Sequence, residues 1–216
     1  MQKTKKVLIG SGIALVLVLL VSGINVFQNG FGSKNLSPEK ILNKPLNEIT
    51  REDVLNLSKS DFVQLFYSLP APAVDDLKGE YKAANLPAGI MAASVQFYTD
   101  HFFGPGKWTG KAFRSINGKK GEGYNIFSEK KDGTLVRNRT RKIDTHVGPS
   151  AFDEKDSYHL IYGKYNTFPV DSMCDELRRL NENLYVGLGY MAAGGGSINP
   201  SPFIVYGEPG PWVGAN

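Results

Sequence analysis

The chain has 216 residues, of which 41% are hydrophobic and 21% charged, a composition typical of a folded globular protein. Its formal net charge is +4, but Lys3, Lys5 and Lys6 precede an apolar run and all 21 acidic residues follow it, so the rest of the chain is close to neutral. This balance excludes the basic surface of a nucleic-acid-binding protein. The single cysteine, Cys174, excludes an internal disulfide.

The N-terminal segment 1–29 contains an uncharged, mostly apolar run over residues 7–27. At about 1.5 Å per residue, a helix of this length crosses the hydrocarbon core of a bilayer. The three lysines before it predict a cytoplasmic N-terminus, and therefore a domain on the extracytoplasmic side. The small residues Val21–Gly23 suit cleavage of a signal peptide, whereas the apolar residues that follow them favour an uncleaved membrane anchor.

Segment 30–72 is predicted to be helical. Ser37–Glu39 combines a cap, a proline and a first-turn acid, which is typical of a helix start. Thr50–Asp53 opens a second helix in the same way, and a third runs from Ser60 to Leu69 with apolar residues at helical spacing. A further amphipathic helix is expected over Gly89–Phe103.

The rest of the domain, 73–216, is dominated by predicted strands. Turn signals, among them Asn117-Gly118 and Asp132-Gly133, separate them. The expected strands are Trp108–Ile116, Gly123–Glu129, Thr134–Val147, Ser157–Tyr165, Leu184–Met191 and Pro202–Tyr206, with a short helix over Asp171–Arg179. Successive hairpins imply antiparallel pairing. We therefore predict an α+β fold, with a curved antiparallel meander sheet or partly closed β-barrel and packed helices.

Three groups of side chains are candidates for function. Tyrosines alternate with small residues on several strands, which suits either an apolar ligand cavity or an ordinary core. Arg137, Arg139 and Arg141 are spaced to share one face of a strand, where they would either bind an anion or face solvent.

The third group consists of Asp144, His146 and His159, which a symmetric hairpin would bring to one face. A carboxylate beside an imidazole suits general base catalysis or metal ligation, and it is equally common as a surface pair. No third ligand at suitable spacing is evident, so we expect neither a metal nor a cofactor.

Two short Gly-x-aromatic turns lead into predicted strands, at Leu77–Tyr81 and at Gly106–Gly110. They resemble the motif that opens the barrel of lipocalin-like (calycin) proteins. The resemblance implies a barrel over Trp108–Tyr206, with Trp108 closing its base, and a lipid or other small apolar ligand. The candidate ligand-binding residues are Trp108, Tyr124, Phe127, Arg139, Tyr158, Tyr162 and Tyr185.

Three functional hypotheses follow, and the leading one is a membrane-tethered extracytoplasmic protein that binds a lipid-like or other small apolar ligand. The second is an envelope module for contact with other proteins, using Ser37–Leu69 and the tail Glu208–Trp212. The third is a hydrolase-type enzyme using Asp144, His146 or His159.

Overall fold

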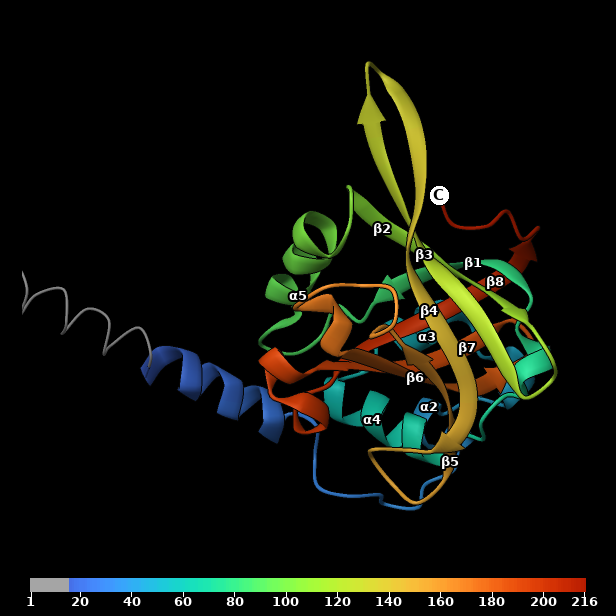
Figure 1. Cartoon of the computed structure of the whole chain (residues 1–216). Coiled ribbons are helices and arrows are strands. Elements are labelled where there is room, and N and C mark those ends of the chain that lie inside the picture. The colour runs from blue at the N-terminus through green and yellow to red at the C-terminus, as the bar shows by residue number, and fades with distance from the viewer. Residues whose placement is uncertain (1–15) are drawn as a thin grey trace, which may run out of the picture.

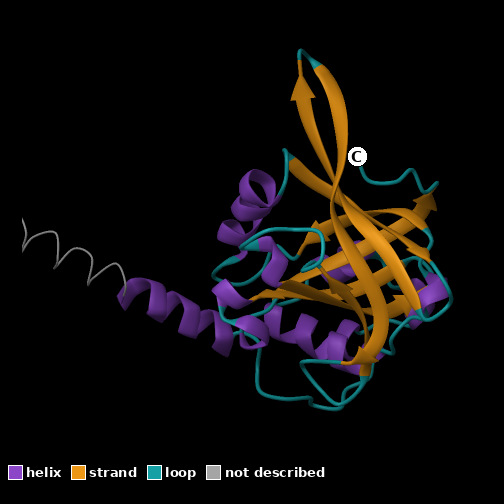
Figure 2. Cartoon of the chain, viewed as in Figure 1, coloured by secondary structure: helices purple, strands orange, loops and turns teal. Residues whose placement is uncertain are grey.

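The computed structural model describes residues 16–216 and contains an eight-stranded, closed antiparallel β-barrel with a few packed helices (Figures 1 and 2). The prediction of an α+β fold with an antiparallel meander is confirmed, and the sheet closes completely. The strands are β1 (Gly79–Asn85), β2 (Lys107–Ser115), β3 (Lys120–Lys131), β4 (Thr134–Pro149), β5 (Asp156–Ile161), β6 (Met173–Asn181), β7 (Leu184–Met191) and β8 (Ser201–Gly210).

Each strand pairs with its neighbour in sequence, and β8 pairs with β1 to close the barrel. The turn between β3 and β4 explains the sharp hairpin that projects from the barrel (Figure 1). Asp132 and Gly133 both have positive φ angles, of 49° and 79°, as the tight hairpin turn for this dipeptide requires. The sequence signal for this hairpin is therefore confirmed.

The barrel begins at Gly79, about thirty residues before the start that the lipocalin-like resemblance implies at Trp108. β1 closes the barrel by pairing with β2 along one edge and with β8 along the other, and its contact with β8 is here called the seam. Gly79 has a φ of 95°, and a Cβ atom there would lie 2.1 Å from the carbonyl oxygen of Gly210. The seam therefore requires glycine at this position.

The predicted helix over Asp171–Arg179 is wrong, because most of this segment forms β6 after the single 3-10 turn Val170–Ser172. Both faces of β6 are covered, so its sequence lacks the alternation of a half-exposed strand. Leu177 packs inside the barrel, whereas Glu176 and Arg178 are buried on the outer face. Segment 150–155 supplies their partners: Asp153 pairs with Arg178, and the amide of Ala151 donates to Glu176, a long-range arrangement that no local pattern shows.

The helices α2 (Pro38–Leu42), α3 (Arg51–Leu55) and α4 (Lys59–Ser68) lie outside the barrel. Their predicted caps are confirmed at Ser37 and Thr50, whereas α4 is capped by Ser58. α4 contacts β7 and β8, and its buried face forms a second apolar cluster with the outer side of these strands. The helical segment is thereby fixed to the barrel.

The two ends of the barrel differ. At one end, the 3-10 turn Val74–Asp76 contacts β2 and β4, and Val74 and Leu77 join the apolar cluster inside. At the other end lie α5 (Ala92–Tyr98) and a single π-helical turn, Thr99–Phe103, which together form the helix predicted over Gly89–Phe103. Two short 3-10 turns, Ala192–Gly194 and Gly196–Ile198, lie at this second end as well (Figure 1).

Residues 16–27 form a helix that leaves the barrel at the same end as α5 (Figure 1). Its C-terminal end is held by hydrogen bonds: Lys59 Nζ donates to the carbonyl oxygen of Asn25 over 3.1 Å, and the amide of Ile90 donates to Gln28 Oε1 over 2.8 Å. Between residues 16 and 216, no helix has the length and apolar character needed to cross a membrane. Residues 7–15 of the predicted apolar segment lie outside the described residues.

Arg178 is a buried charged residue that we expect to stabilise the outer side of the barrel. It is fully buried on the outer face of β6, where it donates to both carboxylate oxygens of Asp153, over 2.8 and 2.5 Å, and to the carbonyl oxygen of Phe66 in α4, over 3.1 Å. The Arg178→Ala change leaves Asp153 without its partner, and we expect it to lower the free energy of unfolding by about 3–5 kcal/mol.

Urea unfolding of the two proteins measures this loss. Arg179→Ala is the matched control, because Arg179 is partly exposed and its ion pair with Asp76 is 3.4 Å long. It should cost less than about 1 kcal/mol. Equal losses in the two variants would contradict the assignment of Arg178 as the link between β6, α4 and segment 150–155.

Candidate functional site

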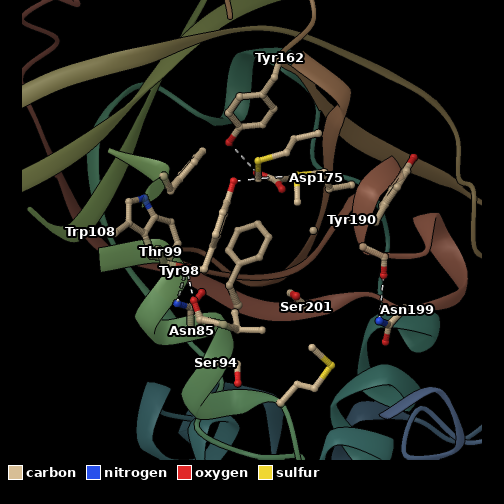
Figure 3. A pocket seen from close by; sticks show the side chains of 18 of the residues that line it. Asn85, Ser94, Tyr98, Thr99, Trp108, Tyr162, Asp175, Tyr190, Asn199 and Ser201 are labelled. Atoms are coloured by element: carbon tan, nitrogen blue, oxygen red, sulfur yellow. Dashed lines mark hydrogen bonds between the residues drawn. The ribbon is translucent and has the colours of Figure 1, made fainter. Parts of the chain in front are cut away.

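A pocket of about 230 Å³ opens at the end of the barrel beside α5 (Figure 3). It lies between α5 and the π-helical turn on one side and β2, β6, β7 and β8 on the other. Its wall is mainly apolar, aromatic and thioether side chains: Met91, Val95, Tyr98, Phe103, Trp108, Met173, Met191 and Phe203. The pocket is thus a mostly apolar space within the mouth of a barrel, a common location for small-molecule sites.

A buried ion pair forms the inner end of this pocket. Lys111 on β2 is 2% exposed and Asp175 on β6 is 3% exposed, and the distance from Lys111 Nζ to Asp175 Oδ2 is 2.7 Å. Lys111 Nζ also donates to Asn125 Oδ1 over 2.9 Å and to the Tyr162 hydroxyl oxygen over 2.6 Å. The three ammonium protons therefore all have acceptors.

Aromatic rings complete the surroundings of Lys111. Its Nζ lies 5.4 Å from the ring centroid of Trp108 and 5.3 Å from those of Tyr162 and Phe203, which are cation–π distances. Burial lowers the pKa of Lys111, and the charge of Asp175 opposes this effect. The hydrogen bonds and ring faces replace the water that the ammonium group loses.

Tyr162 and Trp108 are fixed by the same network. The Tyr162 hydroxyl donates to Asp175 Oδ2 over 2.8 Å and accepts from Asn125 Nδ2 over 3.1 Å. Trp108 Nε1 donates to Asn125 Oδ1 over 3.0 Å. Burial, assisted by the charge of Asp175, raises the pKa of Tyr162 well above its ordinary value, so its hydroxyl stays neutral and donates its proton.

The helical wall of the pocket is attached to the barrel by polar contacts. Asn85 Nδ2 at the end of β1 donates to Thr99 Oγ1 over 3.3 Å and to Gln96 Oε1 over 3.2 Å. Arg141 Nε donates to the carbonyl oxygen of Phe103 over 2.6 Å. These contacts hold α5 and its π-helical turn across the barrel mouth, with Tyr98 facing the pocket (Figure 3).

The residues predicted to bind ligand fall into three places. Trp108 and Tyr162 line the pocket, where Trp108 forms part of the wall and does not close the opposite end of the barrel. Phe127, Tyr158 and Tyr185 lie inside the barrel as members of its apolar cluster, outside the pocket lining.

Tyr124 and Arg139 were predicted to bind ligand, but they lie on the outer face of the barrel and do not line the pocket. The Tyr124 hydroxyl and Arg139 Nε both donate to Glu80 Oε1, over 2.7 and 2.6 Å, and the Tyr124 ring packs on Trp212 of the C-terminal tail. Arg139 points outward because a β-bulge at Arg141, whose φ is 57°, shifts the register of β4. The extra residue turns Ile143 inward while Arg139 points out, although simple alternation places both on one face.

Asp144, His146 and His159 are also on the outer face and do not line the pocket. His146 and His159 are cross-strand partners with stacked rings 5.0 Å apart, and Asp144 instead accepts from the Tyr165 hydroxyl over 3.0 Å. Within the part of the chain that the structure describes, no three metal-binding side chains are clustered. The catalytic hypothesis for this group remains a prediction.

Sequence reasoning missed Lys111, Asn125, Asp175 and Tyr98. One signal was present: Lys111 stands between Gly110 and Ala112 in a predicted strand, and a charged residue flanked by small ones is a candidate for the inner face. Asp175 gave no such signal, because the segment around it was predicted to be helical. The two are 64 residues apart in the sequence.

Comparisons with known proteins give little further information. No family model matches the sequence, and no curated protein matches it. Among solved structures, the chain is similar to a crystal structure of a protein from Thermomonospora curvata, with 19% identity and a TM-score of 0.44, over 67% of this chain and 84% of that one. A similarity this low indicates nothing about function.

The buried pair is open to a direct test. Lys111→Met keeps an unbranched side chain, one atom shorter, but leaves Asp175 buried without a cation, and we expect a loss of about 3–5 kcal/mol in the free energy of unfolding at neutral pH. Adding Asp175→Asn removes the unpaired negative charge, so the double variant should be more stable than Lys111→Met alone. Urea unfolding of the parent protein and both variants detects this non-additivity. A loss below about 1 kcal/mol in Lys111→Met would show that the pair is not a structural constraint.

Proposed function

We propose that this chain is a membrane-tethered, extracytoplasmic protein whose barrel binds a small, mostly apolar molecule in the pocket beside α5. The observation that carries the proposal is the pocket itself: apolar walls within a barrel mouth, with a few fixed polar groups at the inner end. The rest of the interior is filled by a packed apolar cluster.

The size of the pocket indicates how much of a ligand it takes. At about 30 Å³ per water-sized group, 230 Å³ accommodates roughly eight non-hydrogen atoms. A longer molecule would therefore place one end in the pocket and leave the remainder at the open mouth. This is the arrangement expected for one end of a lipid-like chain.

Methionines support an apolar and flexible ligand. The chain has four methionines, and Met91, Met173 and Met191 all line the pocket. Thioether side chains are unbranched and polarizable, so they adapt to apolar molecules of different shape. Such a wall favours a chain-like ligand over a rigid polar one.

The location of the pocket fits the proposed tether. Asn25, near the end of the N-terminal helix, lines the pocket, and exposed apolar residues lie on the neighbouring segments: Phe27, Ile90, Phe97 and Ile198. A membrane anchor over residues 7–27 would keep this end of the barrel close to the membrane surface, where apolar molecules are concentrated. The outward orientation rests on Lys3, Lys5 and Lys6.

The hypothesis of an envelope interaction module has less support from the contacts. The helical segment that it needs packs on β7 and β8, and Trp212 of the tail packs on Tyr124. One helix of the segment and Trp212 of the tail are therefore engaged within the chain.

Binding can be followed by the fluorescence of Trp108, since Trp212→Phe leaves it as the only tryptophan. With the full chain in phosphatidylcholine vesicles, 1-bromodecane should quench Trp108 on contact in the pocket. Ser201 also lines the pocket, and Ser201→Leu reduces the pocket volume by placing three carbon atoms where serine has one hydroxyl oxygen. We expect this variant to bind 1-bromodecane at least about tenfold more weakly, which corresponds to about 1.4 kcal/mol.

Ser201→Ala is the matched control, because it alters the same position without reducing the pocket volume, and it should be quenched like the parent protein. Equal quenching of the leucine and alanine variants would mean that the probe reaches Trp108 from the membrane rather than through the pocket. That result would overturn the proposed binding function.

The tether is tested separately in a bacterial host. The full chain should remain in the membrane pellet after alkaline carbonate extraction, and the barrel should be digested by protease added from the extracytoplasmic side. Leu17→Arg combined with Leu19→Arg should release it, because each arginine costs about 2.5–3.5 kcal/mol at the centre of a membrane helix. The control is Thr134→Arg, at an exposed position of the hairpin.

Two other outcomes are informative. A soluble chain whose N-terminus lies just after residue 23 would identify a cleaved signal peptide. A barrel resistant to the external protease would contradict export.

A further inference from the structure

The inner end of the pocket carries a hydrogen-bond acceptor that the protein does not use. Asp175 Oδ2 accepts from Lys111 and from Tyr162, whereas Asp175 Oδ1 has no hydrogen-bond partner among residues 16–216. The Asp175 side chain is only 4% exposed, and it lines the pocket. Asp175 Oδ1 is not sealed from the pocket, so a ligand that displaces water from it must donate a hydrogen bond in place of that water.

Gly189 leaves this oxygen accessible from the pocket. A Cβ atom at position 189 would lie 2.6 Å from Asp175 Oδ1, closer than van der Waals contact allows. Gly189 also lines the pocket, directly opposite Asp175 on the paired strands β6 and β7. Any larger residue would displace the carboxylate or cover it.

A second polar atom approaches from the helical wall. In Figure 3, the Tyr98 side chain on α5 extends across the pocket with its hydroxyl directed toward Asp175. The partner of this hydroxyl among the described residues is Met191 Sδ at 4.0 Å, which is a weak acceptor. The Tyr98 hydroxyl is therefore available to donate to a stronger one.

The charge at this end restricts the ligand to an uncharged group. The carboxylate of Asp175 is compensated by Lys111 at 2.7 Å, so a second ammonium group would meet the first in a buried space. A carboxylate would meet the free oxygen of Asp175, again as a like charge. An ether or ester oxygen accepts hydrogen bonds only, and it would leave Asp175 Oδ1 without a donor.

From this arrangement we propose that the pocket binds the hydroxyl end of an uncharged amphiphile, a long-chain alcohol in chemical class. The hydroxyl proton is donated to Asp175 Oδ1, its oxygen accepts from Tyr98, and the hydrocarbon tail runs out along the methionines to the barrel mouth. This inference rests on the proposed binding function and specifies which end of the ligand enters.

The test compares decan-1-ol with 1-methoxydecane, its methyl ether, as competitors of 1-bromodecane in the Trp108 assay. Because a hydrogen bond to a carboxylate typically contributes enough for at least a factor of about ten, decan-1-ol should displace the probe at about one tenth of the concentration of the ether, after correction for partition into the vesicles. Equal competition by the alcohol and the ether would overturn the inference. This comparison needs only the parent protein with Trp212→Phe.

Asp175→Asn adds a sharper outcome. Its amide oxygen must face Lys111 and Tyr162, which are donors, so its NH₂ group turns toward the pocket and replaces an acceptor by a donor. The variant should lose the preference for the alcohol over the ether, leaving a ratio within about twofold. Asp132→Asn, the same change at the exposed hairpin tip, should keep the preference of the parent protein.

The results separate the two proposals. If Ser201→Leu abolishes quenching by 1-bromodecane, the binding function is supported. If the alcohol and the ether then compete equally, the proposed binding of a hydroxyl end is rejected while the binding function remains. Absence of pocket-dependent quenching rejects the binding function itself. If Asp175→Asn does not fold, the comparison of decan-1-ol with 1-methoxydecane in the parent protein still tests whether the pocket prefers the alcohol.

Discussion

The buried pair of Lys111 and Asp175 is the constraint on which the organisation of the barrel interior depends. Two opposite charges inside a closed sheet are tolerated only where their geometry is good and their other protons and lone pairs have partners. Lys111 meets this condition through Asn125 and Tyr162, which come from or follow β3 and β5, while Asp175 comes from β6. One network thus connects strands on different sides of the barrel, and it divides a packed apolar interior from the pocket at the mouth.

The same network determines what the mouth can bind. Lys111 has no proton left for a ligand, and Tyr162 is fully engaged, so the polar chemistry available to the pocket reduces to Asp175 Oδ1 and the Tyr98 hydroxyl. The surrounding wall is apolar and rich in methionine, and it is attached to the barrel through Asn85 and Arg141. In the proposed binding function, this structural ion pair forms the inner end of the pocket and favours uncharged ligands.

Local sequence signals predicted the elements whose causes are local. The Asp132-Gly133 turn, the cap at Thr50 and the alternating strands depend on residues close in sequence, and the structure confirms them. The errors have long-range causes. β6 was predicted to be a helix because the partners of its outer charged residues, in segment 150–155, are distant in the sequence. Arg139 does not share a face with Ile143, as their spacing predicted, because a bulge at Arg141 shifts the register. The pairing of Lys111 with Asp175 joins residues 64 positions apart, so no spacing rule identifies it.

In the proposed binding mode, the pocket holds the hydroxyl end of an amphiphile against Asp175. The most direct measurement is a crystal structure of the full chain extracted from membranes with its bound molecule retained. We expect elongated electron density from the barrel mouth to the inner end of the pocket, ending in an oxygen within hydrogen-bonding distance of Asp175 Oδ1 and the Tyr98 hydroxyl. A pocket closed by Tyr98 donating directly to Asp175, with no density beyond the side chains, would contradict it.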